Sequence, residues 1–193
     1  MPLVMPKISF SPSEWFVGIV VSALSYVVLF YINSWLTSGL IYSLGVNWLY
    51  LPAGLRLFIT LIFGLPGAIG IALATFAISY FGALPQDLTL CIGTGLISGF
   101  APYLARVLIL SNTQLAPDLS NLNLPKLVIC ILLYALLSAG LHQFWYATMA
   151  LDGAGTPNHF LVMFIGDVFG SLLLISVIKY GLDLLRHFKQ RAR

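Results

Sequence analysis

Two ionisable side chains interrupt long apolar stretches and are the first candidates for chemistry in this sequence. Arg56 follows residues 15–55, which contain no Asp, Glu, Lys or Arg, and apolar sequence resumes directly after it. Asp167 lies within the last long apolar stretch, in FIGDVFG. An isolated charge is costly inside a membrane, so such residues pair with one another or mark a functional site. We therefore expect the guanidinium of Arg56 and the carboxylate of Asp167 to lie within hydrogen-bond distance, directly or through one water.

Three interpretations of this pair stay open at this point. In the first, the pair only fixes the register of two helices. In the second, it lines a ligand cavity that opens to the outer side of the membrane. In the third, the two groups never meet and Arg56 extends to the membrane surface, as long cationic side chains do. Arg106, near the end of a later apolar stretch, is expected to reach the surface in that way.

A second group of polar and aromatic residues lies between the last two apolar stretches, and we predict that it gathers at the outer surface. The candidate site residues in it are His142, Trp145, Asp152 and His159. They could form a ligand site, but two histidines and one aspartate near a glycine-rich turn are a weak metal pattern, so no metal site is assigned. Trp145 also suits an anchor at the membrane–water interface, where aromatic residues are enriched.

Catalytic motifs are absent from the sequence. It has no GxSxG, no HExxH, no closely spaced pair of carboxylates and no glycine-rich phosphate loop. We therefore expect neither an enzyme nor a bound cofactor.

The composition defines the setting of these residues. Of the 193 residues, 60% are hydrophobic and 8% are charged, whereas a soluble domain has about 25% charged residues. The mean hydropathy is +0.98. We interpret residues 1–193 as a single integral membrane domain with an N-terminal segment, 1–13, and a basic cytoplasmic tail, 186–193. Cys91 and Cys130 lie in apolar stretches outside any CxxC and are expected to be small buried hydrophobes.

Six transmembrane helices are predicted, which form an all-α polytopic bundle. The second and third are a broken pair, because Gly64, Pro66 and Gly67 form a turn signal inside an apolar run that is too long for one span. The GxxxG spacings of Gly95–Gly99 and Gly166–Gly170 are expected to serve packing inside the bundle. The predicted spans are 14–36, 52–63, 66–81, 88–110, 126–149 and 159–185.

Basic residues predict the orientation of these spans. With six spans both termini lie on one side, and the basic residues near the span ends fall on that side. The loops of the other side contain Asp87 and Asp152 but no Lys or Arg. We therefore predict a multi-pass protein of the inner (plasma) membrane with both termini in the cytoplasm. The basic residues used are Lys7, Arg106, Lys126, Arg186, Lys189, Arg191 and Arg193.

Two stretches resemble the first class of membrane-associated sensor (MASE) domains. In residues 47–76, a tryptophan precedes a Pro-Ala-Gly helix start, an apolar helix, a glycine turn and a second helix rich in glycine and alanine. Residues 164–178 are similar to the closing Gly-Asp-x-x-Gly helix of that family. The matching residues are Trp48, Pro52, Ala53, Gly54, Gly64, Gly67, Gly70, Gly166, Asp167 and Gly170.

The resemblance implies that the protein receives an unknown signal within the membrane and does no catalysis. The chain is shorter than the family's domains and lacks the kinase or cyclic-dinucleotide-synthesising domain that commonly follows them, so we expect a compact, stand-alone relative. The expected function is that of a small sensory or accessory protein of a bacterial-type inner membrane, which binds an unknown ligand or partner between its helices.

Two alternatives remain for the function. The first is the substrate-binding membrane subunit of an energy-coupling-factor transporter, in which the small residues of ALATFAIS would form a docking face. The second is a structural subunit of a larger membrane complex. The expected partners are membrane lipid and a membrane or cytoplasmic signalling protein, and not nucleic acid; the oligomeric state is not predicted.

Overall fold

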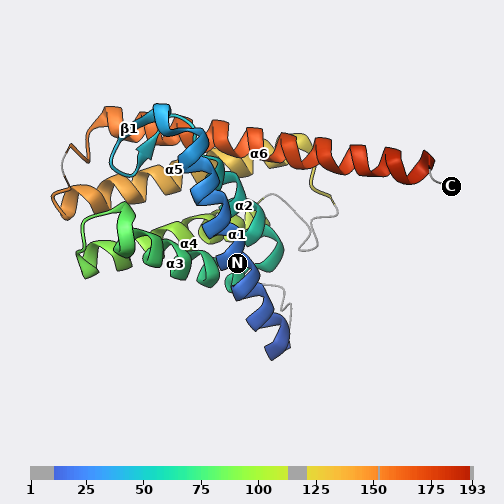
Figure 1. Ribbon diagram of the computed structural model, residues 1–193, viewed down its shortest axis with the longest axis horizontal. Coiled ribbons are helices and arrows are strands. Elements are labelled where there is room, and N and C mark those ends of the chain that lie inside the picture. The colour runs from blue at the N-terminus through green and yellow to red at the C-terminus, as the bar shows by residue number, and fades with distance from the viewer. Residues whose placement is uncertain (1–10, 113–120, 152, 192–193) are drawn as a thin grey trace.

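The computed structural model describes residues 11–112, 121–151 and 153–191 (Figure 1). They form six α-helices and a short β-hairpin, which confirms the predicted all-α bundle. Five of these helices are long and apolar enough to cross a membrane, so this is a multi-pass membrane protein. The elements are α1 (Pro12–Leu36), a 3-10 turn η1 (Ser38–Leu40), β1 (Ile41–Ser43), β2 (Val46–Asn47), α2 (Leu51–Phe63), α3 (Leu65–Ile78), a π-helical turn η2 (Ser79–Ala83), α4 (Leu88–Asn112), α5 (Leu124–Thr148) and α6 (Pro157–Arg191).

Helix α1 begins at a capping box. The side chain of Ser11 accepts a hydrogen bond from the backbone N–H of Glu14 (3.3 Å), and the Glu14 carboxylate accepts one from the backbone N–H of Ser11 (2.7 Å). This satisfies two N–H groups that a helix start leaves free. Most side chains of α1 are exposed, whereas a narrow stripe of small and polar residues is buried: Gly18, Ser22, Tyr26 and Asn33.

The predicted break between the second and third helices is confirmed at Gly64. This residue ends α2 and precedes α3 with φ 61° and ψ −127°, a conformation that side chains on Cβ disfavour. Pro66 lies in the first turn of α3, where its missing N–H costs nothing. Helix α2 has 13 residues and is therefore about 20 Å long, shorter than the hydrocarbon core of a bilayer.

We expect Gly64→Ala to destabilise the protein by about 1–3 kcal/mol, because the variant must hold an L-residue in this strained conformation. The guanidinium of Arg106 adds to the cost, since a Cβ at Gly64 would lie 3.2 Å from its Nη1. The measurement is the unfolding temperature in detergent. Gly181→Ala is the matched control, because a Cβ there meets nothing within 4 Å and alanine favours a helix. Equal unfolding temperatures for the two variants would contradict the role given to Gly64.

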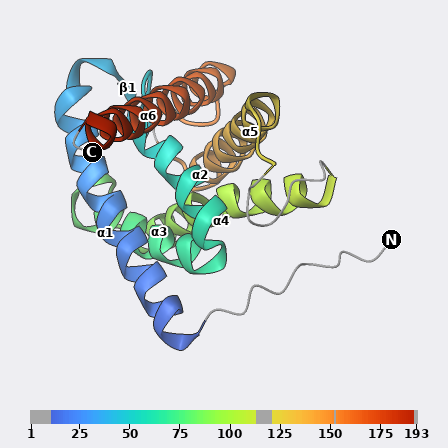
Figure 2. The same cartoon turned by 90° about the vertical axis from the view of Figure 1, so that its right-hand side faces the viewer.

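Helix α2 occupies the centre of the bundle. It packs against all five other helices, most extensively against α6. In the view along the longest axis it lies between α1, α5 and α6 (Figure 2). Residues of α2 are therefore buried on several sides, which explains how a charged side chain on this helix can lie away from water and lipid.

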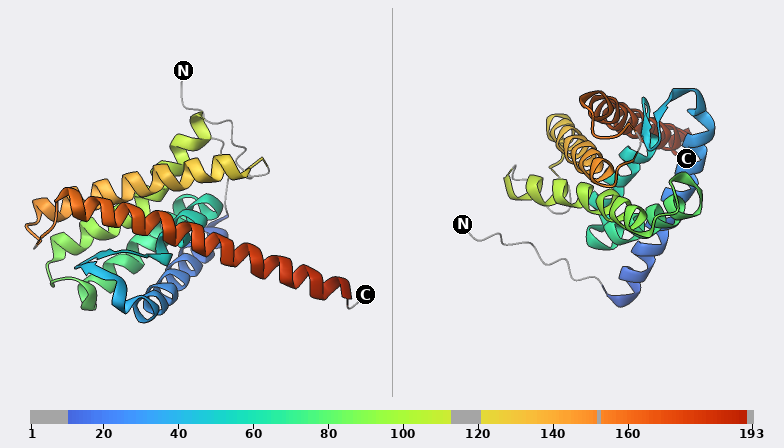
Figure 3. Two further views of the ribbon diagram at one scale, coloured as in Figure 1. Left: turned by 90° about the horizontal axis from the view of Figure 1, so that it is seen from above. Right: turned by 90° about the vertical axis from the view of Figure 1, so that its left-hand side faces the viewer.

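Three connections meet at one end of the bundle, which we call the hairpin end. They are the β1–β2 hairpin, the η2 turn that leads into α4, and the turn between α5 and α6, all on the left in Figure 1. From that end α6 runs the full length of the bundle and projects beyond it (Figure 3).

Both GxxxG motifs pack inside the bundle, as predicted. In α4, a Cβ at Gly99 would lie 2.2 Å from the backbone oxygen of Ala68 on α3. In α6, a Cβ at Gly170 would lie 2.0 Å from the backbone oxygen of Tyr50. Only glycine allows these two helices to approach their neighbours so closely.

Two helix ends differ from the prediction by more than two residues. Helix α3 gives way to the π-helical turn η2 after Ile78, before the predicted end at residue 81. Helix α6 continues to Arg191, whereas the predicted span ends near residue 185. The helix continues because the segment after Gly181 contains neither Gly nor Pro and is rich in helix-forming residues. The two free cysteines are buried, as predicted.

Candidate functional site

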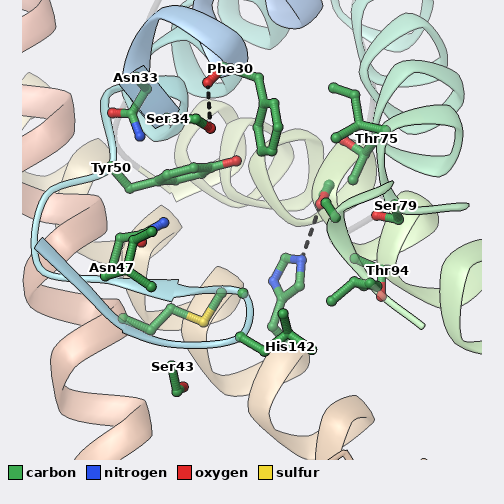
Figure 4. Close-up of a pocket in the computed structure, with 18 of the residues that line it drawn as sticks. Phe30, Asn33, Ser34, Ser43, Asn47, Tyr50, Thr75, Ser79, Thr94 and His142 are labelled. Carbon is green, nitrogen blue, oxygen red and sulfur yellow. Dashed lines mark hydrogen bonds between the residues drawn. The ribbon is translucent and has the colours of Figure 1, made fainter. Parts of the chain in front are cut away.

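A polar cavity lies inside the hairpin end of the bundle. Its volume is about 210 Å³, and its walls come from α1, α2, α3, α4, α5, one residue of α6 and the β1–β2 hairpin. Hydroxyl and amide side chains line much of it, together with tyrosine rings (Figure 4). The lining residues with polar side chains are Tyr26, Asn33, Ser34, Thr37, Ser43, Asn47, Tyr50, Arg56, Thr75, Ser79, Thr94, Ser98, His142 and Tyr146.

Arg56 contributes the positive charge of this cavity. The residue is 4% exposed, and its Nη2 donates hydrogen bonds to the hydroxyls of Tyr26 and, at 3.2 Å, of Tyr50. The two hydroxyls lie 2.8 Å apart. The guanidinium carbon is 5.0 Å and 5.2 Å from the centroids of the same two rings. Neutral oxygens and aromatic rings therefore surround the cation, which favours it but does not neutralise it.

His142, a residue of α5, also lines the cavity. Its Nδ1 donates to the backbone carbonyl of Ser138 (2.8 Å), since a carbonyl has no proton to give. In the neutral ring Nε2 is then the acceptor for the hydroxyl of Ser98 on α4, 3.1 Å away, the contact drawn as a dashed line at His142 in Figure 4. The ring is thus held in one tautomer and one orientation at the cavity wall.

The β1–β2 hairpin bounds the cavity at the hairpin end. Ser43, Leu44 and Gly45 all line it. Gly45 has φ 74°, and a Cβ there would lie 3.2 Å from the ring of Tyr146, so the hairpin rests directly on α5. The hairpin therefore forms part of the cavity wall.

Asn33 fixes the start of α2 relative to α1. Its Oδ1 accepts a hydrogen bond from the backbone N–H of Leu51 (2.9 Å), and its Nδ2 donates to Thr37 (3.1 Å). These bonds satisfy one of the free N–H groups at the N-terminus of α2. They also hold Tyr50, the residue before α2, against Arg56.

A second set of polar groups lies where α2, α5 and α6 meet, and we call it the Asp167 cluster. It consists of Arg56, Tyr134, Ser138, Asp167 and Ser171, and each has a buried polar atom without a hydrogen-bond partner among the described residues. Those atoms are Nε of Arg56, the phenol oxygen of Tyr134, Oδ2 of Asp167 and the hydroxyl oxygens of the two serines. An unsatisfied buried polar group costs about 1–3 kcal/mol, so five in one place are exceptional.

Electrostatic interactions join the members of this cluster. The carboxylate of Asp167, which is 1% exposed, interacts electrostatically with Arg56. Tyr134 interacts with both charged groups. Ser171 follows Asp167 by one helical turn, and its Cα would lie 2.8 Å from a Cβ at Gly54 of α2. The cluster thus links the charge of Arg56 to α5 and α6.

The structure therefore decides only part of the prediction that Arg56 and Asp167 form a pair. Both residues are buried and their charges interact, so the interpretation in which Arg56 reaches the membrane surface is wrong. Among the described residues, Nε of Arg56 and Oδ2 of Asp167 have no hydrogen-bond partner, and Nη2 of Arg56 donates to tyrosine hydroxyls. A bridge through one water stays a prediction. Arg106, predicted to reach the surface, is half-buried with its Nη1 beside the Gly64 turn, and its Nε is buried.

The second predicted group does not gather at one place. His142 lines the cavity, whereas the indole of Trp145 donates to the backbone oxygen of Leu90 on α4 (3.1 Å). His159 contacts Thr156 (2.6 Å), and its ring centroid is 5.0 Å from that of Tyr42. Asp152 lies outside the described residues. In the part of the chain that the structure describes, no three His, Cys, Asp or Glu residues are placed to hold a metal ion.

The tyrosines and hydroxyls around Arg56 were not predicted from the sequence. One signal was present: Ser22, Tyr26 and Asn33 follow one another at helical spacing in an otherwise apolar span. Such a stripe marks the face of α1 that turns away from lipid. Which residue of another helix it meets depends on tertiary packing, and the spacing alone does not give that.

Fold and cavity together define a multi-pass membrane protein with a cavity that is lined by polar side chains and contains a buried arginine. Comparison of the chain with protein-family models, with curated proteins and with solved structures found no match.

Proposed function

We propose that this protein binds a small organic anion, a carboxylate, in the cavity of the hairpin end and acts as a sensory or accessory protein of the membrane. One observation carries the proposal: Arg56 lines a cavity and is surrounded there by neutral acceptors and aromatic rings. A guanidinium presents several N–H donors in a plane that matches a carboxylate, and attraction between the two is strong away from bulk water.

The cavity also limits the size and shape of the ligand. Its 210 Å³ correspond to about seven water molecules, below the range of about 300–1,000 Å³ that holds drug-sized ligands. The rings of Tyr26, Tyr50 and Tyr146 offer apolar surface, and the hydroxyls of Thr75, Ser79 and Thr94 offer hydrogen bonds. A small carboxylate with an aromatic or short aliphatic body fits this combination.

We place the hairpin end on the outer side of an inner (plasma) membrane, with both termini in the cytoplasm. The support is the distribution of Lys and Arg, which favours the cytoplasmic side. A reporter that is active only outside the cytoplasm, fused after Arg193, is expected to give no signal. The same reporter inserted in the loop between α5 and α6 should be active. The reverse pattern would contradict this orientation.

The resemblance to MASE sensor domains supports the sensory reading over the transporter alternative. The transporter alternative needs the small residues of α3 on the surface, as a docking face for an ATPase module. Ala72 and Ala74 of α3 are instead buried inside the bundle, and Gly95 of α4 packs on Ala72. No observation favours a structural subunit. We therefore propose a ligand-responsive protein that transmits binding to a membrane or cytoplasmic partner.

Binding is tested by ligand-induced stabilisation of the purified protein in detergent. Benzoate and lactate are expected to raise the unfolding temperature, because a ligand that binds only the folded state stabilises it. Benzamide and lactamide, which lack the charge, should have little effect. Arg56→Met should abolish the stabilisation by the carboxylates, measured against the variant's own unfolding temperature.

Arg106→Met is the matched control, since it removes an arginine that does not line the cavity. It should respond to the carboxylates as the wild type does. Stabilisation of Arg56→Met to the same extent as the wild type would contradict the role of Arg56. No stabilisation of the wild type by either carboxylate would contradict the proposed ligand class.

A further inference from the structure

We propose that the cavity takes up its carboxylate together with one proton, and that Asp167 holds this proton. The inference rests on the proposed function, since it requires an anion beside Arg56. It goes further in assigning to Asp167, which does not line the cavity, the role of a proton site that is linked to ligand binding.

The guanidinium of Arg56 adjoins both the cavity and the Asp167 cluster. Its Nη2 is bonded to Tyr26 and Tyr50 at the cavity wall. Its Nε belongs to the Asp167 cluster, where both it and Oδ2 of Asp167 are buried without a partner. The same guanidinium is therefore the neighbour of a bound anion and of the carboxylate of Asp167.

The groups that face Asp167 determine its charge balance. It interacts electrostatically with Arg56 of α2, with Tyr50 just before this helix, and with Tyr134 and Tyr146 of α5. Among the described residues, Arg56 is the charged group that interacts with it. The other neighbours are neutral phenols and the hydroxyl of Ser138. With the cavity free of ligand, one cation and one anion give a net charge of zero.

An anion bound at Arg56 changes this balance. Two negative groups would then share one guanidinium in a buried site, and an uncompensated charge is costly there. Uptake of one proton from solution by the Asp167 carboxylate restores neutrality. The resulting carboxylic acid needs an acceptor for its proton, and the hydroxyl oxygens of Ser138 and Tyr134 lie in the cluster without partners.

The first test does not require a ligand. Arg56→Met removes the counter-ion of Asp167, so the carboxyl group of this variant should be protonated at pH 7. Infrared spectra of the protein in lipid nanodiscs should show the carbonyl band of a protonated carboxylic acid. The band should be absent from the Arg56→Met/Asp167→Asn double variant. If Arg56→Met lacks the band, Asp167 remains ionised without Arg56 and the proposal is overturned.

The second test measures benzoate affinity between pH 6 and pH 8. Benzoate remains ionised over this range, so uptake of one proton should weaken binding by up to tenfold per pH unit as the pH rises. Asp167→Asn mimics the protonated state and should bind benzoate with an affinity that is independent of pH, and more tightly than the wild type at pH 8. Binding of neutral benzoic acid would instead leave the pH dependence in this variant.

The outcomes separate the two proposals. A wild type that binds benzoate equally well at pH 6 and pH 8 retains the proposed function but overturns proton uptake. A pH dependence that persists in Asp167→Asn overturns the assignment of the proton to Asp167. A wild type without affinity for benzoate at any pH overturns the proposed function and, with it, the coupling.

Discussion

Arg56→Met is expected to lower the stability of the protein by about 3–5 kcal/mol, because it removes one member of a buried pair of opposite charges. Methionine keeps most of the side-chain volume, so the change acts mainly through the charge and its hydrogen bonds. Asp167 then loses its counter-ion and must take up a proton to remain buried, and the hydroxyls of Tyr26 and Tyr50 lose a donor. The measurement is the free energy of unfolding in mixed detergent.

A double-mutant cycle shows whether the two charges depend on each other. Asp167→Asn alone should also destabilise, since it leaves Arg56 without a counter-ion. The Arg56→Met/Asp167→Asn double variant should be close in stability to the single Arg56→Met variant or more stable, because the orphaned carboxylate is then removed. Strict additivity of the two single effects would show that the charges are uncoupled. The same outcome would exclude a bridge between them through one water.

Gly170→Ala is expected to have the second large effect. A Cβ at this position would lie 2.0 Å from the backbone oxygen and 2.3 Å from the carbonyl carbon of Tyr50, so either α6 or the start of α2 must move. Overpacking costs typically 1–3 kcal/mol and occasionally more, and the upper end applies here because backbone atoms cannot change rotamer. Since Tyr50 contacts Arg56, the variant should also lose stabilisation by benzoate.

Gly140→Ala on α5 is the matched control for this helix-face substitution. The nearest atom that its Cβ would meet belongs to Phe160 at 3.9 Å, an ordinary contact. It should unfold at the temperature of the wild type or slightly above it, since alanine favours a helix over glycine. A Gly170→Ala protein as stable as Gly140→Ala, with intact benzoate response, would contradict the close approach of α6 and the start of α2.

The sequence predicts the helical framework well because its signals are local. Ser11 and Glu14 define the first helix start, and Gly64 with Pro66 defines the break between α2 and α3. Each depends on residues within one or two turns. The π-helical end of α3 could not be predicted, because it depends on how the following turn packs against α4.

The candidate site is predicted less completely, for a geometric reason. The rise per residue places Arg56 and Asp167 at similar depths, and both are buried in the structure. Depth does not give the rotation of each helix about its axis, so the sequence did not show that Nη2 of Arg56 turns to Tyr26 and Tyr50. His142 was predicted to form one group with His159, but it lines this cavity, whereas His159 does not.

The short length of α2 bears on how the chain enters the membrane during synthesis. At about 20 Å it does not span the hydrocarbon core, and it carries a cation that an isolated helix would expose to lipid at considerable cost. Non-helical backbone such as the Gly64 turn is tolerated at membrane depth only when protein covers it. Helix α2 packs most extensively against α6, which is synthesised long after it. We therefore expect α2 to insert as one unit with α3 and to reach its final place only when α6 leaves the ribosome.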